Sequence, residues 1–166
     1  MTGLNPEKNH ILEIATIVTT GGLDEIVEGP SIAIFQSRSI LDSMDEWNTK
    51  HHTSSGLIDR ATKSSFSASD AQSATLDFLK NWVPKGVSPM CGNSVCQDRR
   101  FLCRYMPDLA DYFHYRSIDV STLKELAKRW APRMPLYKKA SRHIAMEDIA
   151  ESIAELQHYK EFFLKF

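Results

Sequence analysis

Two strand-like runs separated by a pair of glycines constrain this chain more than any other feature of its sequence. Residues 11–20, ILEIATIVTT, are rich in β-branched and apolar side chains and end at Gly21 and Gly22. Residues 25–36 continue with the same character. Runs of this kind around a short glycine-containing loop predict a β-hairpin, here with its loop at 21–24. Such a hairpin needs a neighbour in a sheet, and residues 1–10 are too few and too polar to supply one.

Helical periodicity dominates the rest of the chain. Apolar side chains at helical spacing indicate short helices around 40–47 and 71–82, the second stopped by Pro84. Further helices are predicted over 96–106 and 144–162. Residues 122–125 have the spacing of a capping box and predict the start of another helix. Strands are predicted near 88–94 and 115–119, and a loop at 131–142. Met146, Ile149, Ile153 and Leu156 should form one apolar side of the last helix. This order predicts a single α/β layered domain over 1–166, built around a mixed sheet flanked by helices.

Composition excludes several classes of protein. The 166 residues carry a formal net charge of −1, whereas a protein that grips long nucleic acid needs a broad basic face. We therefore expect any nucleic-acid substrate to be short. No apolar stretch approaches the ~18 residues of a membrane span. The three cysteines form no C-x-x-C pair, which favours a reducing compartment, and we expect a cytoplasmic protein.

Two acids and a histidine are candidates for metal-assisted chemistry. Asp98 follows the predicted strand at 88–94, Asp148 lies in the last helix, and His143 closes the loop before that helix. Hydrolysis of a phosphodiester uses hard cations held by carboxylates, together with a base that deprotonates water. Taken singly, each residue is also compatible with an ordinary surface position at the start of a helix. A metal pair needs three or four acids, and these are two.

A second group of residues is typical of an anion-binding site. Arg116 precedes a helix start that carries Ser121 and Thr122, where free backbone N–H groups and the helix dipole favour a phosphate. Ser94 in its Gly-Asn-Ser turn could add a hydroxyl. The alternative is that Ser121 or Thr122 only caps the helix and that Arg116 pairs with an acid. Trp47, near His51 and His52, is either a base-stacking residue or plain core.

Taken together, the chain closely resembles the oligoribonucleases, members of the DEDDh exonuclease family. The segments that carry the resemblance span nearly the whole chain: MTGLNPEKNHILEIATIVT at 1–19, GNSVCQDRRFL at 92–102, YFHYRSIDVSTLKELAKRW at 112–130 and HIAMEDIAESIAEL at 143–156. The resemblance implies a ribonuclease H-like fold. It also implies a 3′→5′ exoribonuclease that degrades short oligoribonucleotides, down to dinucleotides, to 5′-mononucleotides.

The same resemblance assigns roles to individual positions. It implies two-metal-ion hydrolysis with Mg²⁺ or Mn²⁺, with Asp98 and Asp148 as metal ligands and His143 as the general base. It implies a homodimer in which the tyrosine matching Tyr115 reaches the neighbour's site. The positions that match substrate contacts are Leu4, Trp47 and His52 for the bases, and Ser94, Tyr115, Arg116 and Ser121 for the 5′ phosphate. Holding both ends of a dinucleotide in this way would exclude longer chains.

The sequence departs from the family pattern at its start. The family's first motif, an Asp-x-Glu on the first central strand, stands immediately before the Met-Thr-Gly-Leu with which this chain begins. We therefore expect that first strand to be missing from this chain. One interpretation is an incomplete copy of an active enzyme, begun at an internal methionine. The other is a truncated, catalytically impaired form that acts only as a dimer binding 5′-phosphorylated dinucleotides.

Two further hypotheses belong to other classes. A DNA-trimming exonuclease of the same superfamily would hydrolyse deoxy-dinucleotides and long single strands equally well. A purely structural role, with all acids solvated, would give no ligand at all. The metal-independent dinucleotide binder would lose its ligand on Arg116→Ala.

Overall fold

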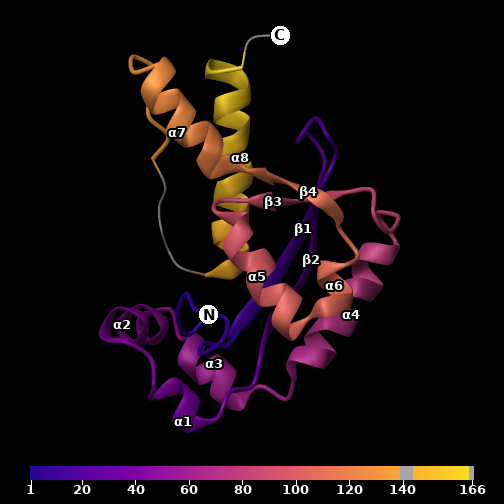
Figure 1. Cartoon of the computed structure of the whole chain (residues 1–166), viewed down its shortest axis with the longest axis vertical. Coiled ribbons are helices and arrows are strands. Elements are labelled where there is room, and N and C mark those ends of the chain that lie inside the picture. The colour runs from indigo at the N-terminus through magenta and orange to yellow at the C-terminus, as the bar shows by residue number, and fades with distance from the viewer. Residues whose placement is uncertain (139–143, 165–166) are drawn as a thin grey trace.

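The computed structural model describes residues 1–138 and 144–164, and it places four strands among helices (Figure 1). The strands are β1 (Glu13–Thr19), β2 (Ile26–Ala33), β3 (Pro89–Gly92) and β4 (His114–Asp119). The helices are α1 (Arg38–Leu41), α2 (Glu46–Ser54), α3 (Leu57–Lys63), α4 (Ala68–Lys80), α5 (Val95–Tyr105), α6 (Pro107–Ala110), α7 (Val120–Trp130) and α8 (Ala145–Phe162). Within these described ranges, no helix is long and apolar enough to cross a membrane.

The predicted hairpin is confirmed. Strands β1 and β2 pair antiparallel, with Glu13 opposite Ala33 and Thr19 opposite Ile26. The register shifts between Ala15 and Ile17, which is the mark of a bulge that bends one strand of the pair. The loop between the strands is short, as the two glycines indicated.

Strands β3 and β4 form a separate parallel pair, joined by a crossover through α5 and α6. The pairing aligns Gly92 with Asp119 at the carboxyl ends of the two strands. Because the carboxyl ends of parallel strands lie at the same edge, the residues that follow each strand are neighbours in space. Asn93 and Ser94 are thereby brought beside Val120 and Ser121, although the two segments are far apart in the chain.

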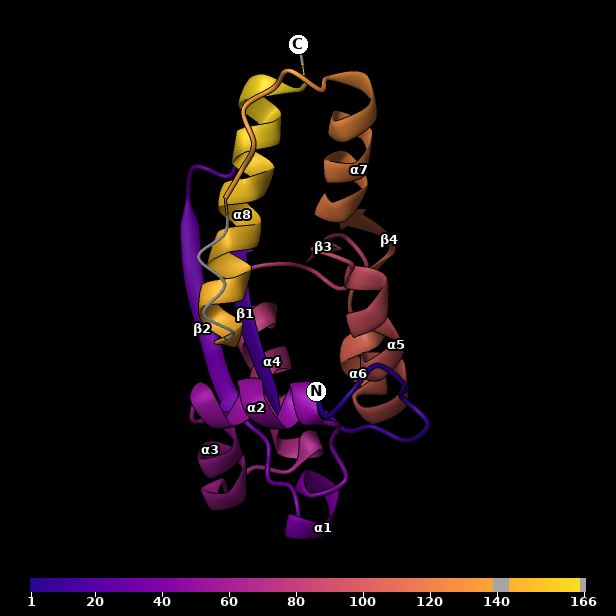
Figure 2. The same cartoon turned by 90° about the vertical axis from the view of Figure 1, so that its left-hand side faces the viewer.

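The α/β class predicted from the sequence is confirmed, with antiparallel and parallel pairing both present and helices flanking the strands. In the described part of the chain, the four strands are divided between two two-stranded sheets. Figure 2 shows the hairpin and α8 on one side of the molecule, with β3, β4, α5 and α6 on the other. The packing of β1 against α8 and of β3 against α7 and α8 connects the two sides.

Most helices follow the predicted periodicity, and the differences have local causes. Helix α4 begins with a capping box between Ser67 and Asp70. The apolar stripe predicted over 40–47 is split between α1 and α2, because Asp45 caps α2 and starts a new helix. Helix α7 begins at Val120 with Asp119 as its cap, so the predicted capping box at 122–125 was wrong. Helices α3 and α6, which span seven and four residues, were not predicted from the sequence.

The largest core cluster lies between the hairpin and helices α4, α5 and α6. Its fully buried members include Phe101, Met106 and Leu109, which pack with Ile34 of the segment after β2. A smaller cluster joins Leu12 to the helices that follow β2. These contacts fix α5, the helix that carries Asp98, against the rest of the molecule.

Helix α8 runs alongside α7 and β1 (Figures 1 and 2). The predicted apolar side, Met146, Ile149, Ile153 and Leu156, is half-buried. The two fully buried residues of α8 are instead Glu155 and Tyr159. Tyr159 joins Val120 and Ala127 of α7 in the third core cluster. A carboxylate therefore occupies the tightest position of this helix interface.

Candidate functional site

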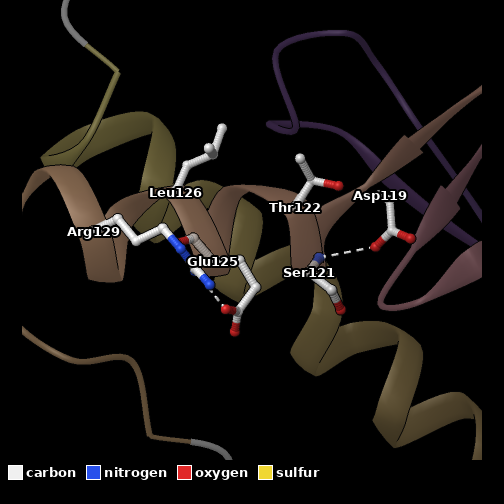
Figure 3. Close-up of a pocket in the computed structure, with 6 residues that line it drawn as sticks. All are labelled: Asp119, Ser121, Thr122, Glu125, Leu126 and Arg129. Carbon is white, nitrogen blue, oxygen red and sulfur yellow. Dashed lines mark hydrogen bonds and ion pairs between the residues drawn. The ribbon is translucent and has the colours of Figure 1, made fainter.

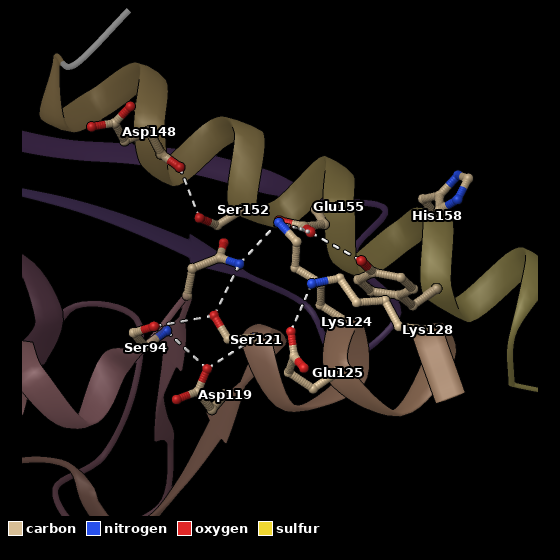
Figure 4. A network of polar contacts seen from close by, with 12 residues as sticks. Ser94, Asp119, Ser121, Lys124, Glu125, Lys128, Asp148, Ser152, Glu155 and His158 are labelled. Atoms are coloured by element: carbon tan, nitrogen blue, oxygen red, sulfur yellow. Dashed lines mark hydrogen bonds and ion pairs between the residues drawn. The ribbon is translucent and has the colours of Figure 1, made fainter. Parts of the chain in front are cut away.

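Two serines predicted to contact a phosphate come together at the shared carboxyl edge of β3 and β4. The hydroxyls of Ser94 and Ser121 lie 3.2 Å apart. The Asp119 carboxylate stands between the two segments and accepts hydrogen bonds from the backbone N–H of Ser94 at 2.8 Å and of Ser121 at 2.9 Å. One side chain thus ties the start of α5 to the start of α7 (Figure 4).

Asp119 changes how an anion could bind at this helix start. Its carboxylate already accepts from the N–H groups of Ser94 and Ser121, which are the groups that a phosphate at the helix N-terminus would use. Ser121 does not cap α7, since Asp119 has that role. The Ser94 and Ser121 hydroxyls are groups with which this edge could still contact an anion.

The backbone of Ser94 is held in an unusual conformation. Its φ of 54° lies in the left-handed region, which residues other than glycine adopt rarely and at some cost in energy. The bond from its N–H to Asp119 helps to hold the turn in this form. Strain retained at an exposed turn that also carries a candidate ligand is typical of functional sites.

Arg116 and Tyr115 are exposed on β4, a few residues before Ser121 in the chain. The Arg116 guanidinium lies over the Tyr115 ring, 5.1 Å from its centroid, a cation–π geometry. Among residues 1–138 and 144–164, Arg116 forms no ion pair with an acid. The alternative in which an acid neutralises Arg116 therefore finds no support in the described structure.

A hollow of about 350 Å³ runs along the exposed side of α7 (Figure 3). It is lined by Asp119, Ser121, Thr122, Glu125, Leu126 and Arg129. Glu125 pairs with Arg129 at 2.6 Å and with Lys128 at 2.8 Å. Hydrogen bonds from Arg129 and Lys128 lower the pKa of Glu125 to about 2. The acid therefore stays ionised at any ordinary pH and keeps Arg129 engaged.

The two acids predicted as metal ligands lie on different helices. Asp98 is half-buried in the first turn of α5, and burial raises the pKa of its carboxyl group, an effect opposed by backbone hydrogen bonding and by the amine of Met1. Asp148 is exposed in the first turn of α8. His143, the predicted general base, lies outside the described residues. Within the part of the chain that is described, no group of three or more His, Cys, Asp or Glu side chains gathers to hold a metal ion.

Asp98 and Asp148 are two carboxylates, fewer than the three or four that a pair of metal ions needs. The environment of Asp98 nevertheless suits a cation. A carboxylate penalised by burial gains most when a positive charge is placed beside it.

Of the three predicted base-contacting residues, Leu4 belongs to the first residues of the chain and His52 contacts them, while Trp47 lies on the same helix as His52. Leu4 and Trp47 are exposed, which excludes the interpretation of Trp47 as core. The Trp47 ring stacks on His51 at 3.9 Å between centroids. The His52 Nε2 atom lies 2.9 Å from the Met1 carbonyl oxygen, and Gln97 of α5 donates a hydrogen bond to the Leu4 carbonyl. Helix α2 and the start of α5 are thus both linked to residues 1–4.

Three residues that organise this region were not predicted from the sequence. Asp119 holds the two serines, Asn93 contacts Ser121, and the buried Glu155 accepts a hydrogen bond from Asn93. An acid at the carboxyl end of a strand, directly before a helix, was a usable signal for Asp119. Nothing in the local sequence marked Asn93 or Glu155, because their contacts join distant segments.

Comparison with known proteins identifies the family. The exonuclease (RNase T) family model matches residues 1–156. An oligoribonuclease of Pseudomonas fluorescens is 59% identical over 167 residues, covering 100% of this chain and 93% of that protein. An oligoribonuclease of Klebsiella pneumoniae is 58% identical, and the match covers 99% of this chain and 92% of that protein. One of Halorhodospira halophila is 56% identical, and the match covers 99% of this chain and 91% of that protein. Members of this exonuclease family generally use divalent metal ions. The chain therefore belongs to the oligoribonuclease family of hydrolytic exonucleases.

Proposed function

We propose that this chain is a 3′→5′ exoribonuclease that converts short oligoribonucleotides, dinucleotides above all, into 5′-mononucleotides. The observation that carries the proposal is the 59% identity to an oligoribonuclease along the whole chain. The formal net charge of −1 agrees with a short substrate, because a long RNA would need many more basic contacts.

The edge formed by Ser94, Ser121 and Arg116 is the proposed binding site for the 5′ phosphate of the substrate. Two hydroxyls 3.2 Å apart can both donate to one phosphate oxygen or to two neighbouring ones. The guanidinium of Arg116, exposed and backed by the Tyr115 ring, would supply the charge. We refer to these four residues as the phosphate pocket.

The other end of the substrate is proposed to lie against Leu4, Trp47 and His52. The exposed faces of Leu4 and Trp47 offer apolar surface on which a base can stack. The phosphate pocket and these residues lie on separate elements and would hold the two ends of the ligand. A ligand held at both ends has a limited length. This is the physical basis proposed for a preference for dinucleotides.

The proposed catalytic groups are Asp98 and Asp148 as two of the ligands of Mg²⁺ or Mn²⁺ and His143 as the general base of two-metal-ion hydrolysis. A divalent ion, when bound, would lower the pKa of a water molecule and neutralise charge on the phosphodiester. The described residues of the phosphate pocket contribute binding and orientation of the substrate.

A homodimer and a reducing cytoplasmic setting complete the proposal. Tyr115 is 72% exposed, as expected of a side chain that reaches a neighbouring copy. Cys91, Cys96 and Cys103 are free and exposed, which suits a reducing compartment. Sedimentation of the purified chain measures the dimer directly.

The proposal is tested by incubating the full chain with Mn²⁺ and a 5′-phosphorylated RNA dinucleotide, and separating the products by chromatography. We expect 5′-mononucleotides, no product in EDTA, and much slower turnover of a long single-stranded RNA. A 5′-labelled trinucleotide should give a labelled dinucleotide first, which is the sign of 3′→5′ polarity.

Matched substrates and variants separate the alternatives. Equal turnover of the deoxy-dinucleotide and of long single strands would instead support the DNA-trimming enzyme. Tight binding of the dinucleotide without hydrolysis would favour the binding dimer. His143→Ala should abolish hydrolysis while leaving binding intact, and Arg116→Ala should weaken binding.

A further inference from the structure

Glu155 is an ionisable residue with no part in the reaction proposed for this chain, yet it is 0% exposed. Glutamates are almost never fully buried unless they are paired, because a carboxylate in the protein interior loses its hydration. The position lies in α8, where an apolar side chain would pack against α7 without that loss. A buried carboxylate retained at such a position calls for a role that an apolar residue would not fill.

The two oxygens of Glu155 have different partners. Oε2 accepts a hydrogen bond from Nδ2 of Asn93 at 3.0 Å. Oε1 accepts from the Tyr159 hydroxyl at 3.0 Å, and the Lys124 ammonium lies 3.5 Å from the same oxygen. The Oε1 side therefore joins α8 to α7, and the Oε2 side reaches the turn after β3 (Figure 4).

The Asn93 amide carries this connection into the phosphate pocket. Its Nδ2 also lies 3.5 Å from the Ser121 hydroxyl, which in turn lies 3.2 Å from the Ser94 hydroxyl. Asn93 directly precedes Ser94, whose left-handed backbone makes the direction of its side chain sensitive to the turn. Fixing the Asn93 side chain therefore fixes both the turn and the direction of the Ser121 hydroxyl.

The charges around Glu155 indicate that it acts by placing a hydrogen-bond acceptor and not through its negative charge. A bare carboxylate near a phosphate would repel it, and Asp119 already contributes one negative charge at this edge. The Lys124 ammonium offsets the charge of Glu155 at Oε1. What remains at Oε2 is a hydrogen-bond acceptor, and a neutral amide oxygen of the same shape can accept the same bond.

We propose that Glu155 is a positioning residue of the phosphate pocket: its buried carboxylate holds the Asn93 amide, which sets the Ser121 and Ser94 hydroxyls to receive the substrate's 5′ phosphate. The inference rests on the proposed function, since it deepens the role of the same pocket. It assigns a task in substrate selection to a side chain that touches no substrate.

The test compares a 5′-phosphorylated RNA dinucleotide with the same dinucleotide lacking the 5′ phosphate. For the full chain, binding of each is measured by calorimetry in EDTA, and kcat/KM in Mn²⁺ gives a second value of the same preference. Glu155→Ala and Asn93→Ala should each lower the preference for the phosphorylated form about tenfold, the size of one well-placed hydrogen bond to a charged group. Glu155→Gln should retain the wild-type preference.

Tyr159→Phe is the matched control, because it removes a partner of Oε1 and leaves the Asn93 bond to Oε2 in place. It should lower the melting temperature and keep the preference, whereas Glu155→Ala should lower both. A folded Asn93→Ala or Glu155→Ala variant with an unchanged preference would overturn the positioning role. A wild-type chain without any preference would overturn the phosphate pocket itself, a separate result that removes the proposed site.

Discussion

Asp119 is a single acid that holds two residues of the proposed phosphate pocket in place without belonging to that pocket itself. Its carboxylate accepts hydrogen bonds from N–H groups at the starts of α5 and α7. Asp119 and Ser94 are 25 residues apart in the chain. Were the side chain absent, the strained turn at Ser94 and the first turn of α7 would both lose an acceptor. We therefore expect the residue to affect both stability and binding at the proposed phosphate pocket through the same two bonds.

We expect Asp119→Ala to lower the free energy of unfolding by about 1 kcal/mol, the usual cost of losing a helix cap. Asp119→Asn keeps a side-chain oxygen and should stay within a few tenths of a kcal/mol of the wild type. Denaturant unfolding followed by circular dichroism measures both. Equal losses in the two variants would mean that the charge of Asp119, rather than its hydrogen bonds, supports the fold.

Asp98 is the residue whose substitution should reduce metal binding and hydrolysis together. We expect Asp98→Asn to reduce the rate of dinucleotide hydrolysis by at least about 10²-fold, the scale of losing one electrostatic stabiliser of a transition state. Calorimetric titration with Mn²⁺ should show weaker binding in the same variant. Asp111→Asn, at an exposed acid after α6, is the control and should change neither quantity. A fully active Asp98→Asn variant would remove this residue from the proposed metal site.

Among the elements, helix α7 combines the cap, part of the phosphate pocket and a surface charge cluster. Glu125, Lys128 and Arg129 form that cluster one turn after Ser121. Since the pKa of Glu125 is lowered to about 2 from a usual 4.5, the unfolded chain takes up the proton at higher pH than the folded chain does. The stabilising contribution of Glu125 is therefore complete above pH 4.5 and is lost as the pH falls toward 2.

We predict that Glu125→Gln lowers the melting temperature slightly above pH 5, and that the difference from the wild type disappears as the pH approaches about 2. The effect should be small because Glu125 is exposed, and it should shrink in high salt. Thermal melts over a pH series measure it. A difference that grows on acidification would have the wrong sign for a carboxyl group with a lowered pKa.

The contact between β2 and α4 depends on one glycine. A Cβ atom added to Gly29 would come within 2.4 Å of the Phe78 ring. The ring belongs to α4 and is half-buried, packed against the main core cluster. The absence of a side chain at Gly29 is thus what lets the helix approach the strand this closely.

Gly29→Ala should therefore destabilise the fold by about 1–3 kcal/mol, the usual cost of overpacking a core. Gly21→Ala, in the hairpin loop, is the matched control, because its added Cβ meets nothing within 4 Å. Denaturation midpoints of the two variants give the comparison. If both variants unfold like the wild type, then α4 shifts freely and the close approach carries no strain.

At the scale of the whole molecule, local pattern predicted the elements well. The hairpin, the long helix α4 and the order of strands and helices from 88 onward followed from β-branched runs, periodicity and stop signals. Helices α3 and α6 were not predicted because segments of seven and four residues carry too little periodicity to recognise. The start of α7 was misplaced because the capping-box spacing competed with Asp119, and the acid at the strand end supplied the real cap.

The site was harder to predict from the sequence than the fold. Family resemblance marked Ser94 and Ser121, and the structure brings their hydroxyls together. Glu155 was missed because the apolar side predicted for α8 consists of its neighbours. Its burial is made tolerable by Asn93 and Lys124 from other segments, together with Tyr159 of α8 itself. Side chains whose partners are distant in the chain leave no local pattern to read.

The separation of Asn93 and Glu155 by 62 residues has a consequence during protein synthesis. At a translation rate of about 5–20 residues per second, the ribosome needs several seconds to pass from one residue to the other. In that interval β1 and β2 can already pair, since the hairpin is local, whereas the turn at Ser94 still lacks the helix that holds Asn93. A nascent chain would thus form its hairpin before the helix that holds Asn93 is available, and the proposed phosphate pocket would be complete only when the last helix docks.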